Sequence, residues 1–223
     1  MTLLIILSFF IFLITGFIII YNRFSANLKS LEFAGEFREK FVEFANEYIN
    51  TYDNWSNRGI INGTTYAWLT MNVNKMQEQL GHLGTMHYIA PFQIYQIPSY
   101  EILINTIPKF RDGSVQEFDL NHSDDCLLRY LGVIEKIVNQ NQKNLWNPIV
   151  WFKEGVHEIL SLPIFIFKWF GIFGNRTMAR IMTSSIYKAF TGLTALVALV
   201  SGIVTIIQGK EKTLEFIAKL LNN

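Results

Sequence analysis

The sequence predicts a mainly α-helical, membrane-anchored domain with a transmembrane helix near each end of the chain. Half of the 223 residues are hydrophobic, only 17% are charged, and the mean hydropathy is positive, at +0.23. Two long stretches without charge lie near the two ends. Between them, large apolar residues recur every three or four positions, which is the period of an α-helix. This composition favours a membrane protein over a water-soluble one.

The first apolar stretch, residues 3–20, is predicted to cross a membrane as an uncleaved anchor at residues 1–21. Its length of about 18 residues is near the lower limit for a hydrocarbon core about 30 Å thick. No basic residue precedes it and no small-residue cleavage site follows it, which argues against a removed signal peptide. Because Arg23 and Lys29 follow it, the positive-inside rule places the next domain, residues 22–147, in the cytoplasm.

The second apolar stretch, residues 189–208, is predicted to be a transmembrane helix, followed by a short charged tail at residues 209–223. Thr194, Ala198 and Gly202 are spaced four residues apart and share one helix face. Small side chains let another helix approach closely, so this face is predicted to pack against the first span or against a second copy. The alternative is that small residues are simply common in spans.

The segment 148–174 is apolar but contains Pro163 and Lys168. A lysine near the bilayer centre costs at least about 2.5 kcal/mol, and the apolar part is short for a span. We therefore expect an interfacial or re-entrant amphipathic segment, with a third membrane crossing as the alternative. Trp151 and Trp169 are of the aromatic type found at membrane interfaces, where Lys168 can also reach water.

The region between the anchors, residues 22–147, is predicted to be one mainly helical domain. Helices are expected over residues 28–50 and 65–80. In the first of them, aromatic residues recur at steps of three and four with glutamates on the other faces, which predicts burial in a core; docking of a partner is the alternative. These aromatic residues are Phe33, Phe37, Phe41, Phe44 and Tyr48.

A third helix is expected to begin at Ser123 and to run to about Gln142. Ser123 can cap the helix, and Asp124 and Asp125 then lie in its first turn, where the helix dipole favours acidic side chains. Pro148 suits the first turn of the helix that follows.

The region of residues 81–112 contains three prolines that prevent one continuous helix. Short strands at residues 88–90 and 92–97 and a helix at about residues 99–106 are alternatives that the pattern leaves open. Loops of this length often bind ligands or partners, although irregular core packing is equally compatible with the pattern. The residues predicted to form a binding surface are His87, Tyr88, Tyr95, Tyr100 and Arg111.

Known catalytic and metal-binding patterns are absent from the sequence. His82 and His87 are five residues apart, which is not the spacing of a helical zinc pair, and His157-Glu158 lacks a second histidine because position 161 is serine. The single cysteine, Cys126, excludes a disulfide framework and a thiolate zinc cluster and is predicted to be a buried thiol.

One acidic group could surround a hard cation, but a solvated turn and helix cap explain the same residues better. Its members are Asp119, His122, Asp124 and Asp125. We therefore predict no catalytic residue, no metal and no cofactor. No basic stripe accompanies a nucleic-acid-reading motif, so nucleic acid is not expected as a partner either.

Several short strings and the order of the segments resemble a family of small bacterial membrane proteins without an assigned function. The strings are Thr70–Gln77, with the sequence TMNVNKMQ, and Asn147–Gly155, with the sequence NPIVWFKEG, which leads into Leu162-Pro163 and the WFG at residues 169–171 before the last span. The resemblance implies an integral protein of the bacterial inner membrane and implies no mechanism.

Three functions are compatible with these features. The first is a non-enzymatic binding, sensing or scaffold module that sits in the lipid bilayer and contacts a protein partner, or a second copy through the last span. The second is a membrane-perturbing effector of stress or phage defence. The third is a metal-dependent, membrane-bound hydrolase.

Overall fold

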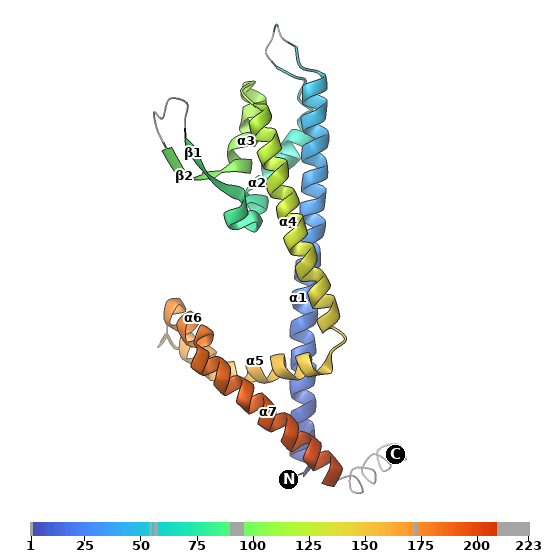
Figure 1. Ribbon diagram of the computed structural model, residues 1–223, viewed down its shortest axis with the longest axis vertical. Coiled ribbons are helices and arrows are strands. Elements are labelled where there is room, and N and C mark those ends of the chain that lie inside the picture. The colour runs from blue at the N-terminus through green and yellow to red at the C-terminus, as the bar shows by residue number, and fades with distance from the viewer. Residues whose placement is uncertain (1, 54, 56–57, 90–95, 172–173, 209–223) are drawn as a thin grey trace. The chain divides into compact units, whose positions relative to one another are not determined.

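The computed structural model describes residues 2–53, 55, 58–89, 96–171 and 174–208 (Figure 1). This part of the chain contains seven α-helices, one short 3₁₀ helix and two strands, so the predicted mainly helical class is confirmed. The chain divides into two compact units. One consists of residues 26–139, and the other combines the N-terminal 25 residues with residues from 140 onward.

Helix α1, Thr2–Asn50, runs without interruption through the expected anchor and the expected helix over 28–50. Its sequence contains no proline, and the part from Ala26 onward is rich in Ala, Leu, Glu, Lys and Arg, which favour helix. In the unit 26–139, Phe37, Phe41, Phe44 and Tyr48 on α1 are almost fully buried. The aromatic stripe is therefore a core face, as its spacing predicts.

Helix α2, Gly63–Leu80, confirms the predicted second helix. Asn62 caps it, because its side-chain oxygen accepts a hydrogen bond from the Thr65 backbone N–H at 3.3 Å. A single 3₁₀ turn, η1 (Gly81–Gly84), then leads the chain into the strands.

Strands β1 (Thr85–Ile89) and β2 (Gln96–Glu101) form an antiparallel two-stranded sheet with an irregular register between Met86 and Tyr88 (Figure 1). The observed strands overlap the expected ones at residues 88–89 and 96–97, and each strand is the pairing partner of the other. Residues 90–95, which include Tyr95 and most of the expected strand 92–97, lie outside the described residues.

Helix α3, Ile102–Asp112, contains Pro108 in its interior and so continues past residue 106, where the expected helix of this region ends. A helical proline loses one hydrogen bond and crowds the preceding turn. Here Leu103, Ile107 and Phe110 share a buried face, and this burial outweighs that cost. The helix ends at Gly113, whose φ of 71° is the left-handed conformation typical of a helix C-terminus.

Helix α4, Glu117–Asn144, begins six residues before the predicted start at Ser123. The true start is stabilised by Asp119, whose carboxylate accepts the Gln116 backbone N–H at 3.0 Å in the manner of a capping box. Ser123 lies inside the helix, is fully buried and donates to the Thr106 hydroxyl at 3.4 Å. A serine followed by two aspartates imitates a cap, and only the contact with α3 shows its different role.

The other unit contains three further helices, α5 (Pro148–Trp169), α6 (Asn175–Thr183) and α7 (Ser185–Gln208). Helix α5 starts at Pro148, as predicted, and passes through Pro163 without a break. The core of this unit consists of Phe152, Val156 and Ala195, packed against side chains such as Phe9 and Phe12 of α1.

Two helices of the described residues are long and apolar enough to cross a membrane: α1 from Leu7 onward and α7 over Ser185–Val204. Only 11% of the apolar window of α1 and 18% of that of α7 is buried within the protein. Most of their apolar side chains are therefore uncovered by protein.

The closest helix crossing in this second unit joins Gly16 of α1 to Gly155 of α5. A Cβ atom on Gly16 would overlap the Trp151 carbonyl group and would lie 2.8 Å from the Gly155 nitrogen. A Cβ atom on Gly155 would overlap the Phe12 carbonyl group and lie 3.1 Å from the Gly16 nitrogen. Two glycines at one crossing let the backbones touch, which is the small-residue packing expected between apolar helices.

The predicted small-residue face of α7 takes part in packing at two of its three positions. Ala198 contacts the core of the unit, and Gly202 is buried with the Phe9 ring 3.1 Å from where a Cβ would be. The Thr194 hydroxyl donates to the Phe190 carbonyl of its own helix at 2.8 Å. The small-residue pattern of the last span does not include Gly16 and Gly155, the two glycines of the close crossing described above.

Replacing Gly155 with alanine is expected to destabilise this unit by about 1–3 kcal/mol, because the new methyl group meets backbone atoms that cannot rotate away. The thermal unfolding midpoint of the full chain in detergent measures the effect. Gly132→Ala is the matched control, since Gly132 is a helical glycine with nothing within 4 Å of its Cβ position. The control should gain up to about 1 kcal/mol from helix propensity. A Gly155→Ala protein as stable as the control would contradict the close crossing.

Candidate functional site

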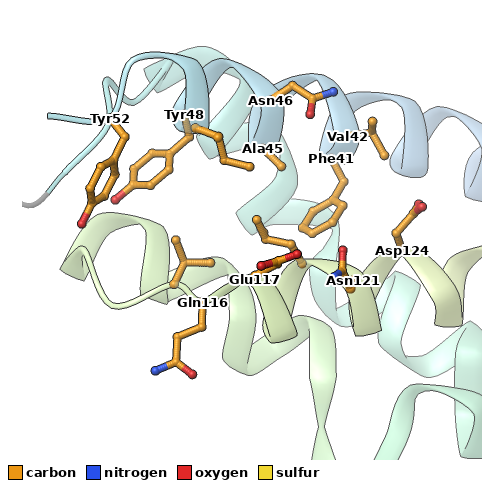
Figure 2. Close-up of a pocket in the computed structure, with 13 residues that line it drawn as sticks. Phe41, Val42, Ala45, Asn46, Tyr48, Tyr52, Gln116, Glu117, Asn121 and Asp124 are labelled. Carbon is orange, nitrogen blue, oxygen red and sulfur yellow. The ribbon is translucent and has the colours of Figure 1, made fainter. Parts of the chain in front are cut away.

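A groove of about 760 Å³ lies between α1 and α4 in the unit 26–139 (Figure 2). Its volume is in the range of ligand-binding clefts, which is about 300–1,000 Å³. Residues of α1 form one wall, namely Phe41, Val42, Ala45, Asn46, Tyr48 and Ile49. The other wall consists of Val115, Gln116, Glu117, Leu120, Asn121 and Asp124.

The interior of the groove is apolar, and its edges are polar. Val42 and Leu120 are half-buried, and Ile49 leaves 53% of its surface exposed. Asn46, Glu117 and Asn121 are exposed at the edges. This combination of an apolar interior with few polar groups at the edge is typical of binding sites.

An ion pair lies beside one end of the groove. Arg38 of α1 donates two hydrogen bonds to the Asp124 carboxylate of α4, from Nε at 2.7 Å and from the terminal nitrogen at 3.1 Å. Both side chains are about one third exposed, so solvent screens the pair and its contribution to stability is small. Its role is geometric, because the two bonds hold the guanidinium and the carboxylate in one plane between the two helices.

Two tyrosines lie at the other end, where Figure 2 shows their rings next to each other. The ring centroids of Tyr48 and Tyr52 are 6.2 Å apart in an edge-on arrangement. Tyr48 is almost fully buried, and its hydroxyl has no hydrogen-bond partner among the described residues. An unpaired buried hydroxyl costs about 1–3 kcal/mol, so this residue of the groove carries a hydrogen-bonding capacity that the fold leaves unused.

Asp119 determines where the α4 wall begins. It is buried, accepts the Gln116 backbone N–H and also accepts a hydrogen bond from Lys109 Nζ at 2.6 Å. Burial lowers the pKa of Lys109, but the hydrogen bond and charge of Asp119, with a smaller contribution from Tyr100, outweigh it, so the pKa lies above its ordinary value. Lys109 therefore stays charged, and the pair holds the first turn of α4, which carries Glu117, in place.

The walls of the groove present apolar, amide and carboxylate side chains, and Arg38 is paired with one of the two carboxylates. Within the described residues, no three His, Cys, Asp or Glu side chains gather as a metal site requires. In the acidic group considered above, Asp119 and Asp124 are bonded to Lys109 and Arg38.

Four of the five residues predicted as a binding surface lie on the β1–β2 sheet and on α3, apart from the groove lining. Tyr88 and Tyr100 stack with ring centroids 5.0 Å apart and are half-buried. His87 is exposed on β1, and Arg111 is exposed in the last turn of α3. Tyr95 lies outside the described residues. The structure thus brings two of the five together.

Sequence reasoning did not identify the groove. The one signal in the sequence is the end of the aromatic stripe of α1, where Ile49 and Tyr52 continue the apolar pattern past the last fully buried position, Tyr48. The partner wall on α4 begins more than sixty residues later. No local pattern connects the two walls.

The predicted membrane-interface residues are on α5. Trp151 is half-buried: its ring lies 5.0 Å from the Phe17 ring, and its indole N–H donates to the Asn144 carbonyl at 3.1 Å. Trp169, at the end of α5, is largely exposed. The side chain of Lys168 lies outside the described residues.

Cys126 is a buried thiol, as predicted, on the side of α4 that faces the core. Burial raises its pKa; Arg129 opposes this effect and Asp125 adds to it, so the thiol has a higher pKa than usual. We expect iodoacetamide at pH 8 to alkylate Cys126 in the folded chain at least about 100-fold more slowly than in urea-unfolded chain, since both access and thiolate fraction are reduced. Mass spectrometry of timed samples measures both rates, and equal rates would contradict the burial.

Comparison of the chain with protein-family models, with curated proteins and with solved structures finds no match. The function has to be inferred from the residues of this chain.

Proposed function

We propose that this chain is an integral protein of the bacterial inner membrane, with a cytoplasmic domain at residues 26–139 that binds a protein partner in the groove between α1 and α4. The observation that carries this proposal is α1 itself. One continuous helix contains an apolar segment long enough to cross a membrane and, at its other end, one wall of the groove.

The membrane setting is supported by exposure and by charge. Most of the apolar windows of α1 and α7 are not buried by protein, and a lipid phase would cover them without cost. Arg23 and Lys29 follow the first window, so the positive-inside rule favours a cytoplasmic domain.

A binding role rather than an enzymatic one is supported by the groove lining. The apolar positions Val42, Ile49 and Leu120 offer contact area, and the polar residues at the edge are amides and carboxylates. A carboxylate whose partner is an arginine, as Asp124 is, is poorly placed to take a proton from a substrate.

The binding role is tested by site-specific photo-crosslinking from the full chain in its native membrane. A photoreactive residue at Ile49 should give a discrete adduct with a partner protein. The same residue at Met71, which is 81% exposed on α2 and outside the groove, should not. The same adducts from both positions, or none from Ile49, would contradict the proposal.

The topology is tested by cysteine accessibility in a Cys126→Ala background. Cysteines at Asn74, Arg180 and Lys212 are labelled with a membrane-impermeant maleimide before and after the membrane is opened. A cysteine at Asn74 should be labelled only after opening. Labelling in intact cells would contradict a cytoplasmic domain, and the other two positions give the number of crossings.

A membrane-perturbing effector is the second candidate, and the exposed aromatic end of α5 is the observation that favours it. Trp169 and Phe170 are both largely exposed, and aromatic side chains of this kind insert at the membrane interface. Dye release from vesicles that contain the purified chain tests this role. Vesicles that stay tight, together with a crosslinked partner at Ile49, would favour the binding module.

A further inference from the structure

The side chains on the two walls of the groove are spaced as on helix faces against which a third helix packs. Along α1, Val42, Ala45 and Ile49 follow one another by one turn, and along α4 Glu117, Leu120 and Asp124 do the same. Rows of this kind are the ridges into which the side chains of a neighbouring helix fit. The α1 wall from Phe41 to Ile49 rises about 12 Å, which matches two to three turns of a bound helix.

The groove lies in an acidic part of the protein. On α4, Glu117 is an exposed carboxylate of the lining, whereas Asp124 of the same wall is paired with Arg38. On α1, Glu39 and Glu43 are exposed but lie outside the lining, whose polar residue on this helix is Asn46. The unit 26–139 as a whole has nine Lys and Arg against fourteen Asp and Glu, a net charge of −5, whereas the complete chain is at +1. A basic occupant is therefore favoured over an acidic one.

We propose that the groove binds a basic amphipathic helix of a partner protein, with apolar residues against Ile49 and Leu120 and with lysine or arginine residues facing Glu117. This inference rests on the proposed binding role and specifies the chemistry of the partner. A helix laid into a groove by its apolar face, with charges at the rim, is a recurring mode of recognition.

Tyr48 adds a hydrogen bond to this interaction. Tyr48 belongs to the groove lining, and its buried hydroxyl has no partner among the described residues. A carbonyl or side-chain oxygen of the bound helix accepts the hydroxyl hydrogen. The same group lowers the stability of the empty domain, because it is desolvated without a partner.

The probe is a 14-residue peptide of leucine and lysine with the leucines at helix spacing, and its control has glutamate in place of every lysine. The receptor is the full chain in phosphatidylcholine nanodiscs, with empty nanodiscs as a blank, and binding is followed by fluorescence anisotropy. The lysine peptide should bind saturably and at least about tenfold more tightly than the glutamate peptide, with a preference that falls as salt increases.

Three variants of the full chain locate the site. Ile49→Lys should weaken binding of the lysine peptide at least about tenfold, whereas Met71→Lys, the same change at an exposed apolar position outside the groove, should leave it unchanged. Tyr48→Phe should weaken binding about three- to tenfold and leave the melting temperature unchanged or raised. Such a pattern distinguishes a binding contact from a structural one.

The outcomes separate this inference from the proposed function. Equal or tighter binding of the glutamate peptide would contradict the claim that the partner helix is basic, and the proposed binding role would still stand. If neither peptide binds but a partner adduct forms at Ile49, the claim that the partner binds as an amphipathic helix is contradicted, and the proposed binding role still stands. An Ile49 adduct with twice the mass of the chain would show that the occupant of the groove is a second copy of this chain and not another protein. Unchanged affinity in Tyr48→Phe would remove the hydrogen bond from the proposal.

Discussion

Replacing Phe110 with alanine is expected to destabilise the unit 26–139 by about 3–5 kcal/mol, the usual cost of deleting a buried aromatic ring. Phe110 is completely buried at the end of α3. Its ring centroid lies 4.9 Å from that of Phe44, 5.1 Å from that of Tyr48 and 6.3 Å from that of Phe41. The α1 residues that carry the groove therefore pack on this one ring, and its loss leaves a cavity behind the α1 wall.

The urea concentration at which Cys126 becomes open to alkylation in the full chain measures this effect, because the single cysteine lies within the same unit. Phe118→Ala is the control, since Phe118 is 43% exposed on α4 and packs mainly on the His122 ring, 4.0 Å away. We expect the control to cost about 1 kcal/mol or less. Equal midpoints for the two variants would contradict the central position of Phe110.

Replacing Gln77 with alanine is expected to cost about 2–6 kcal/mol, although glutamine is a polar residue and lies on a helix. The side chain is buried and satisfies two backbone groups at once. Its amide nitrogen donates to the Gly84 carbonyl at 2.8 Å, and its oxygen accepts the Leu103 backbone N–H at 3.1 Å. The first N–H groups of a helix have no partner within it, so Gln77 acts as the missing cap of α3. Each buried group left unpaired costs about 1–3 kcal/mol.

The same alkylation midpoint measures this variant. Gln77→Glu keeps an acceptor for Leu103 but places a carboxylate against the Gly84 carbonyl, so it should also destabilise the unit. Gln142→Ala, at an exposed position of α4, should change the midpoint little. If Gln77→Ala were as mild as Gln142→Ala, water would have to reach both backbone groups, and the sealed contact between η1 and α3 would be wrong.

The helices with a regular apolar period are those that the sequence predicts well. The aromatic stripe of α1 depends on residues within a few turns of one another, so it can be recognised without knowledge of the fold. The start of α4 was missed because two candidate caps compete. The one that forms is stabilised by Lys109, which belongs to another helix. The interior proline of α3 was missed for a related reason, since its cost is offset by burial against other elements.

The groove could not be predicted because it is a property of two segments that are distant in the chain. Exposure of Ile49 and burial of Tyr48 depend on what α3 and α4 cover, and the sequence does not say which part of an apolar stripe remains uncovered. The tyrosines predicted as a surface instead pair with each other: Tyr88 and Tyr100 meet across the two strands.

For this protein, composition and period by themselves determined a helical chain with two segments apolar enough to span a membrane and an acidic region between them. These properties follow from hydrophobic transfer and from the helix repeat, which act locally. Only the tertiary structure decided that Gly16 and Gly155 make a close crossing, that Gln77 caps a distant helix, and that α1 and α4 leave a groove lined by Tyr48, whose hydroxyl has no partner among the described residues. Each of these depends on which surfaces meet, and contacts between distant segments are not encoded in any short stretch of sequence.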